Sequence, residues 1–429
     1  MDTVTAHALI RFGLGRRGEQ PLPTEPVKWL QDQVEADDAA AWDPKLPTSA
    51  DGLTVLREQY KLNLPQGPAL VDPLFRADVA AQTQHLLTTD APFRERLVWF
   101  WANHFTVSIR QGGTNATIGP YIREAIRPNV TGPFYAMLLA VMRHPAMLMY
   151  LDNNASFGPN SIAGKAQKRG LNENLARECL ELHTVSPAAN YTQADVTAFA
   201  GIISGWSVEL NRLFPGFQFR EAAHEPGMKT LMGRKFPPGE AGGIAALEFL
   251  AHHPATHRHL ATRMVRHFVS DDPPEAAVRS IEGVLRDTGG DLGAASVALL
   301  HLEQAWTPLA KLRSPLDYAV ATLRALDLPT DKQVPLQGVL GSLGQPLWTA
   351  PLPNGWSDMA SEWAAPEAMM RRVDWTYSIA GRAERDPMEV AEASLGPLLQ
   401  PRTRDALRGA GSRRDAMTLL LTSPEFQRR

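Results

Sequence analysis

The sequence predicts an all-α protein with one short β-hairpin or extended loop near residues 217–232. Two observations lead to this prediction. Most segments of the 429-residue chain repeat their apolar side chains at the helical period of three to four positions. The alternation of apolar and polar residues that is typical of strands is rare. We expect a single large helical domain over residues 6–429, or two packed lobes at about 6–155 and 156–429.

Helical signals follow one another through the first part of the chain. The first sixty residues predict short helices separated by proline-rich loops. Residues 92–108 predict a strong helix, because apolar positions recur along one face. Residues 133–150 predict a very apolar helix that Pro145 divides, since proline lacks the amide donor and clashes with the preceding turn. Residues 152–170 are polar and contain glycines, which predicts a loop.

The second part of the chain is also mostly helical. Thr192 is a good N-cap, and Asp195 stands in the position of a capping box. Residues 214–233 interrupt the helical pattern, and the alternation around Gln218 predicts the hairpin. Residues 327–361 are rich in Pro, Gly and Trp and predict a loop. Further helices are expected at about 243–268, 274–286, 294–304, 311–326, 365–382 and 413–421.

Composition narrows the class of protein. With 44% hydrophobic and 21% charged residues, the chain resembles an ordinary soluble globular protein. A net charge of −3 argues against a nucleic-acid or anionic-membrane partner. The single cysteine, Cys179, excludes an internal disulfide and a cysteine-based zinc site. No segment is long enough to span a membrane, and no signal peptide is recognised. We therefore expect a cytoplasmic protein, unless a partner carries it out.

The most informative segment is 171–184, which holds three Glu, two Asn, one Arg and one His. Helical spacing places Glu178 on the same apolar face as Leu175 and Cys179. A buried carboxylate must be paired, protonated or bound to a metal. This pattern is typical of a functional site, and equally of a structural ion-pair network. Arg177 stands at i, i+4 from both Glu173 and Glu181, which favours the network.

Several histidines are further candidates. His104 lies on the apolar face of its helix, where a histidine is more often a core residue than a ligand. His183 can converge with Glu181 if the helix ends near residue 186, but the spacing matches no standard metal motif. His224 and Lys229 lie on a glycine-bearing loop that suits a substrate-facing lid, although a surface turn is the favoured interpretation. The histidines between residues 252 and 259 are typical of a solvated helix junction.

Several long motifs resemble the bacterial DUF1800 family, whose function is unknown. The resemblance runs from about Ala6 to the C-terminus. The sequence departs from the family's pattern at two places. Cys179 stands where Leu or Met is usual, and residues 185–190 replace a more glycine-rich turn. The motifs that carry the resemblance are Phe100-Trp101-Ala102-Asn103-His104-Phe105, Asn172-Glu173-Asn174-Leu175-Ala176-Arg177-Glu178, Glu181-Leu182-His183-Thr184, Tyr191-Thr192-Gln193-Ala194-Asp195-Val196, Ser204-Gly205-Trp206, His224-Glu225-Pro226-Gly227-Met228-Lys229-Thr230, Arg313-Ser314-Pro315, Gly344-Gln345-Pro346-Leu347 and Ser423-Pro424-Glu425-Phe426-Gln427.

The resemblance implies a mostly helical fold and names no reaction. It also implies a partner, because such genes commonly neighbour one for a DUF1501 protein. Proteins of that second family resemble the alkaline phosphatase and sulfatase superfamily and often carry a twin-arginine export signal. Export together with such a partner is therefore compatible with the resemblance.

Our leading hypothesis is an enzyme whose site lies between the His104 helix and the Glu-rich helix, under the loop of His224 and Lys229. Four residues would bind a metal or act as acid and base, and Arg177 would hold a carboxylate or an anionic substrate. The sequence identifies no cofactor, although this set would suit a divalent metal. The four candidate ligands are His104, Glu178, Glu181 and His183.

The rival hypothesis is a non-catalytic partner protein. Its Glu173, Arg177, Glu178 and Glu181 would form a buried ion-pair network, and the C-terminal tryptophans would form an interaction surface. A third alternative, a heme or other organic cofactor held by His104 or His183, has no motif in its favour. The tryptophans of the rival hypothesis are Trp348, Trp356 and Trp363.

Overall fold

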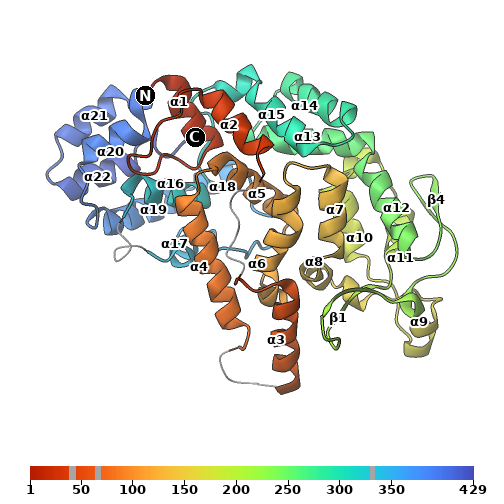
Figure 1. Ribbon diagram of the computed structural model, residues 1–429. Helices are drawn as coiled ribbons and strands as arrows, with labels where there is room; N and C mark the ends of the chain where they lie inside the picture. The colour runs from red at the N-terminus through yellow and green to blue at the C-terminus, as the bar shows by residue number, and fades with distance from the viewer. Residues whose placement is uncertain (38–44, 63–68, 329–333) are drawn as a thin grey trace.

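The computed structural model describes residues 1–37, 45–62, 69–328 and 334–429, and the chain is helical through most of them (Figure 1). Strands form only two small antiparallel hairpins within these ranges. The predicted all-α class is therefore confirmed. Across the described ranges no helix is both long enough and apolar enough to cross a membrane.

The N-terminal elements lead to one central helix, α5. Its side chains are buried on nearly every face, and proline occupies its first position, where the missing amide hydrogen costs nothing. It ends at His104, four residues before the predicted end. The helices of this part are α1 (Thr3–His7), α2 (Pro26–Glu35), α3 (Ser49–Leu62), α4 (Asp72–Thr88), α5 (Pro92–His104) and α6 (Ile118–Tyr121).

The next group of helices confirms two local predictions. Pro145 divides the apolar segment into two helices, and Thr192 with Asp195 forms the capping box. A short helix, α9, lies within the segment that we expected to be a loop. The Glu-rich segment forms one short helix followed by a π-helical turn, Cys179–His183. The helices are α7 (Phe134–Arg143), α8 (Pro145–Tyr150), α9 (Ile162–Gln167), α10 (Asn174–Glu178) and α11 (Gln193–Ile202).

The predicted hairpin region contains parts of two hairpins. β1 (Trp206–Glu209) pairs with β2 (Gly216–Phe219), with Trp206 opposite Phe219. β3 (Lys229–Leu231) pairs with β4 (Arg234–Phe236). The alternation around Gln218 therefore belongs to the second strand of the first hairpin.

The C-terminal half is again helical. Pro254 begins a new helix inside the predicted segment 243–268, with His253 as its N-cap. The helices are α12 (Glu240–Ala251), α13 (Pro254–Phe268), α14 (Glu275–Asp287), α15 (Leu292–Leu300), α16 (Pro315–Leu326), α17 (Leu336–Ser342), α18 (Ala360–Trp363), α19 (Pro366–Ala380), α20 (Pro387–Ser394), α21 (Pro401–Arg408) and α22 (Arg413–Leu421).

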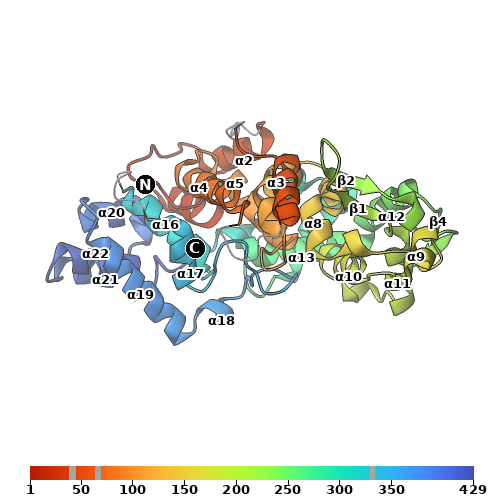
Figure 2. The same cartoon turned by 90° about the horizontal axis from the view of Figure 1, so that it is seen from below.

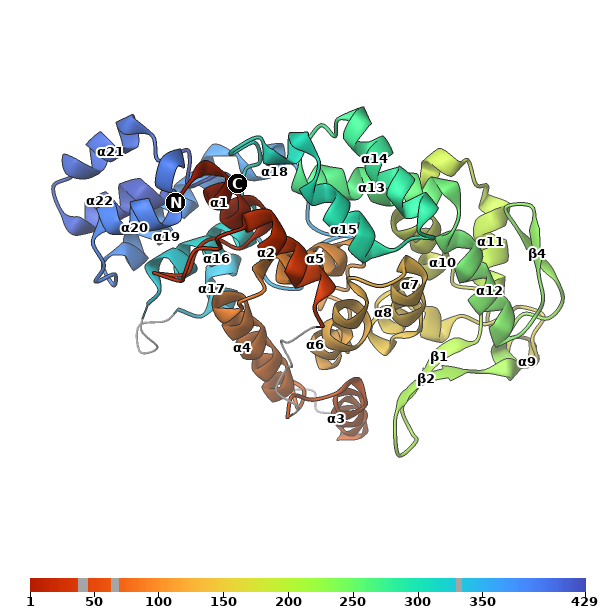
Figure 3. The ribbon, with the colours of Figure 1, turned by 45° about the horizontal axis from the view of Figure 1, so that its top comes forward.

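The elements form an elongated body, with α19–α22 at one end and α9–α12 with the hairpins at the other (Figure 2). Helices α5 and α13 lie between these ends (Figure 3). They contact each other through Phe100 and Phe268, whose ring centroids are 5.8 Å apart. One cluster of buried apolar side chains includes residues on both sides of position 155. The division into two lobes stays a prediction.

Candidate functional site

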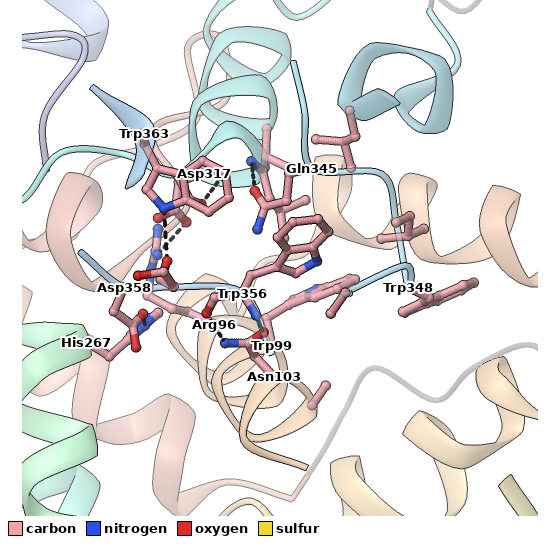
Figure 4. Close-up of a pocket in the computed structure, with 18 of the residues that line it drawn as sticks. Arg96, Trp99, Asn103, His267, Asp317, Gln345, Trp348, Trp356, Asp358 and Trp363 are labelled. Carbon is pink, nitrogen blue, oxygen red and sulfur yellow. Dashed lines mark hydrogen bonds and ion pairs between the residues drawn. The ribbon is translucent and has the colours of Figure 1, made fainter. Parts of the chain in front are cut away.

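A pocket of about 110 Å³ lies between α5, the C-terminal end of α13, α16 and the segment 345–363 (Figure 4). We call it the tryptophan pocket, because four tryptophans line it together with several charged side chains. The residues used below are Arg96, Trp99, Asn103, His267, Asp317, Trp348, Trp356, Asp358, Trp363 and Arg429.

Two hydrogen bonds fix the segment that forms one wall of this pocket. The Trp356 amide donates to Oδ1 of Asn103 at 2.7 Å, and Nδ2 of Asn103 donates to the Trp356 carbonyl at 2.8 Å. Gly355 has φ of +76°, and a Cβ there would lie 2.4 Å from the Asn103 carbonyl oxygen. Only glycine fits this close approach. The wall therefore has a defined position relative to α5.

The tryptophans line an interior space. Trp348 and Trp363 are each only 8% exposed, so the predicted interaction surface is wrong for these two residues. Their rings turn inward because Trp363 Nε1 donates to the Ser357 carbonyl at 2.9 Å and Trp348 packs against Phe75. Trp356 and Trp363 lie 6.0 Å apart between ring centroids. The walls are thus aromatic and largely shielded from solvent.

His267 and Asp358 form a hydrogen-bonded pair in the pocket wall. Nδ1 of His267 lies 2.6 Å from Oδ1 of Asp358. Nε2 of His267 is buried and has no hydrogen-bond partner in the described part of the chain. Burial lowers the pKa of His267 to about 4, although the Asp358 carboxylate opposes this shift. The imidazole is therefore neutral at pH 7, with the Nδ1 proton shared with Asp358 and a free lone pair on Nε2.

Asp358 is itself held as an anion. Burial alone would raise its pKa, but His267, Arg263 and Lys311 outweigh burial and lower it. Nη2 of Arg263 lies 4.0 Å from the second carboxylate oxygen. Lys311 donates to the Asp358 carbonyl at 2.8 Å and pairs with Asp271, whose carboxylate accepts the Ala360 amide. The position of Asp358 is thus fixed through both backbone and side chain.

A second charged group lies beside this pair. Asp317 accepts from Nη1 of Arg96 at 2.6 Å and lies 2.9 Å from Nε of Arg429. Burial would raise the pKa of Asp317, but the two guanidinium groups lower it instead. Nη1 of Arg429 is buried and has no hydrogen-bond partner among the residues described. One carboxylate therefore serves two cations at the pocket wall.

One face of α13 leads from His267 in the pocket wall toward two of the residues predicted from the sequence. His259, Arg263 and His267 stand at i, i+4 and i+8 on α13, along one face. At the far end of this row, Nε2 of His104 lies 3.2 Å from the His183 carbonyl oxygen. The rings of His104 and His183 are 5.9 Å apart between centroids. The structure thus brings these two predicted histidines together and places them beside Arg263, whose charge helps to lower both pKa values after burial itself.

The predicted carboxylates do not complete that group. Glu178 is half-buried rather than buried, and it makes no hydrogen bond or ion pair with another described residue. Burial and then Glu181 raise the pKa of Glu178. Arg177 pairs instead with Glu173, at 3.0 Å between partly exposed side chains, and with Gln193. The buried four-residue ion-pair network is therefore wrong.

The four predicted metal ligands also fail to form one ligand set. Over the described ranges, no three His, Cys, Asp or Glu side chains are grouped so that they can hold a metal ion. The reason is local: His104 and His183 turn into the core beside Phe105, whereas Glu178 and Glu181 remain partly exposed. A divalent metal at His104, Glu178, Glu181 and His183 has no support in this geometry.

His224 and Lys229 form a separate pair on the hairpin region. Nδ1 of His224 donates to the Ser204 carbonyl at 2.9 Å, and its Nε2 accepts the Gly239 amide at 2.8 Å. Nζ of Lys229 lies 3.3 Å from the same Nε2 and donates to the Glu225 carbonyl. Both ring nitrogens are thus used within the protein. A role of His224 and Lys229 in a lid stays a prediction.

Sequence reasoning missed the residues that form the pocket wall. His267 follows His259 by eight positions on a predicted helix, which was the available signal. Asp358 follows an Asn-Gly-Trp-Ser sequence in the loop rich in Pro, Gly and Trp. Asn103 stands next to the candidate His104 in the sequence. No sequence pattern indicates that its side-chain amide binds the Trp356 backbone, more than 250 residues away.

The comparisons with known proteins agree with the resemblance of the motifs. A family model described as "Protein of unknown function (DUF1800)" matches residues 7–428. No curated protein and no solved structure matches the chain. Because the family model spans nearly the whole sequence, the protein belongs to the DUF1800 family.

Proposed function

We propose that the protein is an enzyme that binds a small organic molecule in the tryptophan pocket and moves a proton with His267. The observation that carries this proposal is the state of the His267 ring. Asp358 accepts a hydrogen bond from the Nδ1–H group of His267. Nε2 of His267 is buried without a hydrogen-bond partner among the described residues, in a side chain that lines the pocket. A neutral imidazole in this tautomer is a general base.

The role of Asp358 follows from its charge and position. It fixes the tautomer and orientation of His267, and its negative charge stabilises the imidazolium that forms when Nε2 takes a proton. Asp358 is therefore a positioning residue, while His267 would touch the substrate or a water molecule. The proton that His267 accepts can return to the leaving group in a later step.

The pocket wall favours direct proton transfer over a covalent intermediate. Two serines line the pocket, and each hydroxyl oxygen accepts a hydrogen bond from a backbone amide. Oγ of Ser314 accepts the Asp317 amide at 3.2 Å, and Oγ of Ser357 accepts the Met359 amide at 3.1 Å. Neither is hydrogen-bonded to His267 in the described part of the structure. This supports a step in which His267 takes a proton from a water molecule or from the substrate itself.

This proposal places the reaction in the tryptophan pocket and not among the candidate catalytic residues that were predicted from the sequence. Catalysis by His104, Arg177, Glu178, Glu181 and His183 stays a prediction, as does assembly with a DUF1501 protein. The tryptophan pocket is favoured because it combines a cavity, a hydrogen-bonded acid–base pair and unpartnered polar atoms in one place.

The variant His267→Asn tests the proposal. The amide nitrogen of asparagine takes about the place of Nδ1, so the hydrogen bond to Asp358 is kept and Nε2 is lost. We expect the wild-type protein to consume a compound from a small-molecule extract, followed by mass spectrometry. His267→Asn should slow this reaction by about 10²- to 10⁴-fold without lowering the melting temperature.

Asp358→Asn tests whether Asp358 positions the His267 ring for catalysis or only stabilises the fold. It should lower the rate and change its dependence on pH, because the charge that stabilises the imidazolium is gone. The rival non-catalytic function predicts that these variants change the melting temperature alone. An unchanged rate in His267→Asn, or no compound consumed by the wild-type protein, would contradict the proposal.

A further inference from the structure

We propose that the protein docks on an anionic phospholipid bilayer through one face of its surface. This face is formed by the C-terminal end of α3, the connection between β1 and β2, and α9, and we call it the projecting face. It contains none of the residues that line the tryptophan pocket, so the inference goes beyond the proposed function. The face is defined by the exposed apolar side chains of Leu62, Ile162, Leu213 and Phe214.

The three elements project from the same side of the elongated body. In Figure 1 they lie along its lower edge, and Figure 2 looks onto that side. Leu62 at the end of α3 is 58% exposed, and Ile162 at the start of α9 is 79% exposed. Because a bilayer is an extended surface, it can contact several elements that project to one side at the same time.

The connection between β1 and β2 carries two adjacent large apolar side chains at the end of a hairpin that extends from the body (Figure 3). Leu213 is 85% exposed and Phe214 is 80% exposed. Nη1 of Arg57 on α3 donates to the carbonyls of Leu210 and Arg212, each at 3.1 Å, which holds this connection against α3. A fixed loop that exposes two such side chains is typical of a binding site that buries them in another apolar medium.

The segment around α9 combines an exposed apolar side chain with exposed cations. Residues 153–172 contain three cations and no acidic residue. All three cations are exposed, and none forms an ion pair with another described residue. The carboxylate of Glu225 contacts this segment, but it accepts two hydrogen bonds from Asn160, at 2.9 and 2.7 Å. The three cations are Lys165, Lys168 and Arg169.

The same combination recurs on the other two elements. Arg212 directly precedes Leu213, and Lys61, in a weak exposed pair with Glu58, directly precedes Leu62. Apolar side chains that enter the acyl region beside cations at the phosphate level are typical of segments that lie on an anionic membrane. The net charge of −3 describes the whole chain and not this face.

Shape favours a bilayer over a protein partner. The apolar side chains lie on three separate elements and project outward. A protein partner would need a matching concave site for each of them, whereas a bilayer accepts projecting side chains without a matching shape. The bound state therefore needs no change in the fold.

Vesicle co-sedimentation of the full chain tests the inference. Vesicles of phosphatidylcholine alone are compared with vesicles that also contain about 30% phosphatidylglycerol. We expect the anionic vesicles to bind at least about 10-fold more tightly, and this preference should shrink when NaCl is raised from about 0.1 M to about 0.5 M. Equal binding to both kinds of vesicle, or binding to neither, would overturn the inference.

Paired variants locate the contact. Leu213→Ser combined with Phe214→Ser should weaken binding to the anionic vesicles by about 100-fold. The melting temperature should stay unchanged, because both side chains are exposed. The control combines Met370→Ser with Leu419→Ser, two exposed apolar residues on α19 and α22 at the other end of the body, and should bind as the wild type does. Equal losses in the two pairs would overturn the inference.

The charge of α9 is tested separately. Lys165→Gln combined with Lys168→Gln should weaken binding to the anionic vesicles about 10-fold and leave binding to the neutral vesicles unchanged. Unchanged binding of this variant to the anionic vesicles would contradict the role of the cations.

A fluorescent label then distinguishes insertion into the bilayer from contact with another protein chain. Leu213→Cys is labelled with nitrobenzoxadiazole, while the native Cys179 is buried and stays unlabelled in the folded protein. Anionic vesicles should raise the emission of this label and shift it to shorter wavelength, and the same label at Leu419→Cys should not respond. A dimer in sedimentation velocity that Leu213→Ser with Phe214→Ser abolishes, together with no response of the label, would assign the face to a second copy of the chain and overturn the inference.

Discussion

Asn103 and Trp356 are joined by two reciprocal hydrogen bonds between one side-chain amide and one backbone unit. This contact ties the middle of a long irregular segment to α5. Asp358 follows Trp356 by two residues, so the same contact sets where its carboxylate meets His267. The geometry of the tryptophan pocket thus depends on a residue that does not bind the charged groups itself.

Asn103→Ala should destabilise the protein by about 2–4 kcal/mol, because two hydrogen bonds are lost and two backbone groups of Trp356 lose their partner. Urea unfolding followed by tryptophan fluorescence measures this change. Asn174→Ala is the matched control, since Asn174 is exposed, and it should shift the free energy of unfolding by less than about 0.5 kcal/mol. Equal effects of the two substitutions would mean that the Asn103 contact does not hold the segment.

Gly355→Ala should also disrupt the pocket wall. The new Cβ would meet the carbonyl and side-chain oxygens of Asn103 at 2.4 and 2.6 Å, and alanine disfavours a φ of +76°. We expect a loss of at least about 1–3 kcal/mol in the free energy of unfolding. Gly338→Ala in α17 is the control: nothing lies within 4 Å of its Cβ position, and it should stabilise the helix by about 0.5–1 kcal/mol. Thermal unfolding of both variants distinguishes these opposite signs.

The fold was predictable from the sequence where the signals were local. Pro145 divides two helices because a proline acts on its own turn, and the Thr192–Asp195 capping box spans only four residues. The first hairpin was harder to predict from the sequence. Its strand β2 pairs back to Trp206, which follows Gly205 at φ of +80°, and no local pattern indicated that turn from helix into strand.

The candidate site was less predictable, for two physical reasons. His267 and Asp358 are 91 residues apart, and periodicity reports which face is buried but not what it meets. The second reason is a change of helical phase. The apolar face that contained Glu178 assumed 3.6 residues per turn, whereas the chain enters a π-helical turn at Cys179. Beyond that point His183 is buried and Leu182 is only half-buried, whereas Glu178 lies before the turn, at the end of α10, and is half-buried.

Glu178→Gln should therefore leave the melting temperature unchanged or raise it slightly. The substitution removes the repulsion from Glu181 and breaks no ion pair, because Arg177 binds Glu173 instead. Thermal unfolding at pH 7 measures the effect, with Glu181→Gln as the matched variant. A clear drop in melting temperature for Glu178→Gln alone would restore the structural role that the sequence suggested.

His183→Leu should stabilise the protein, and the gain should grow as the pH falls. Both ring nitrogens of His183 are buried without a hydrogen-bond partner among the described residues, which costs about 1–3 kcal/mol. Burial, with help from His259 and Arg263, lowers the pKa of His183 to about 3. Between about pH 6.5 and pH 3 the unfolded chain therefore binds a proton that the folded chain does not.

The sign of the pH effect follows from this difference. Stability rises with pH wherever the unfolded state holds more protons, so wild-type stability falls as the pH drops through that window. Removing His183 removes one such proton, and at pH 5 the additional gain should be about 2 kcal/mol. Urea unfolding at pH 7, 6 and 5 measures it, with His301→Leu, at an exposed position, as the matched control for the loss of a histidine. If His183→Leu instead lost enzyme activity at unchanged stability, His183 would belong to the reacting groups, and the chemistry would extend along α13 from His267 to His104.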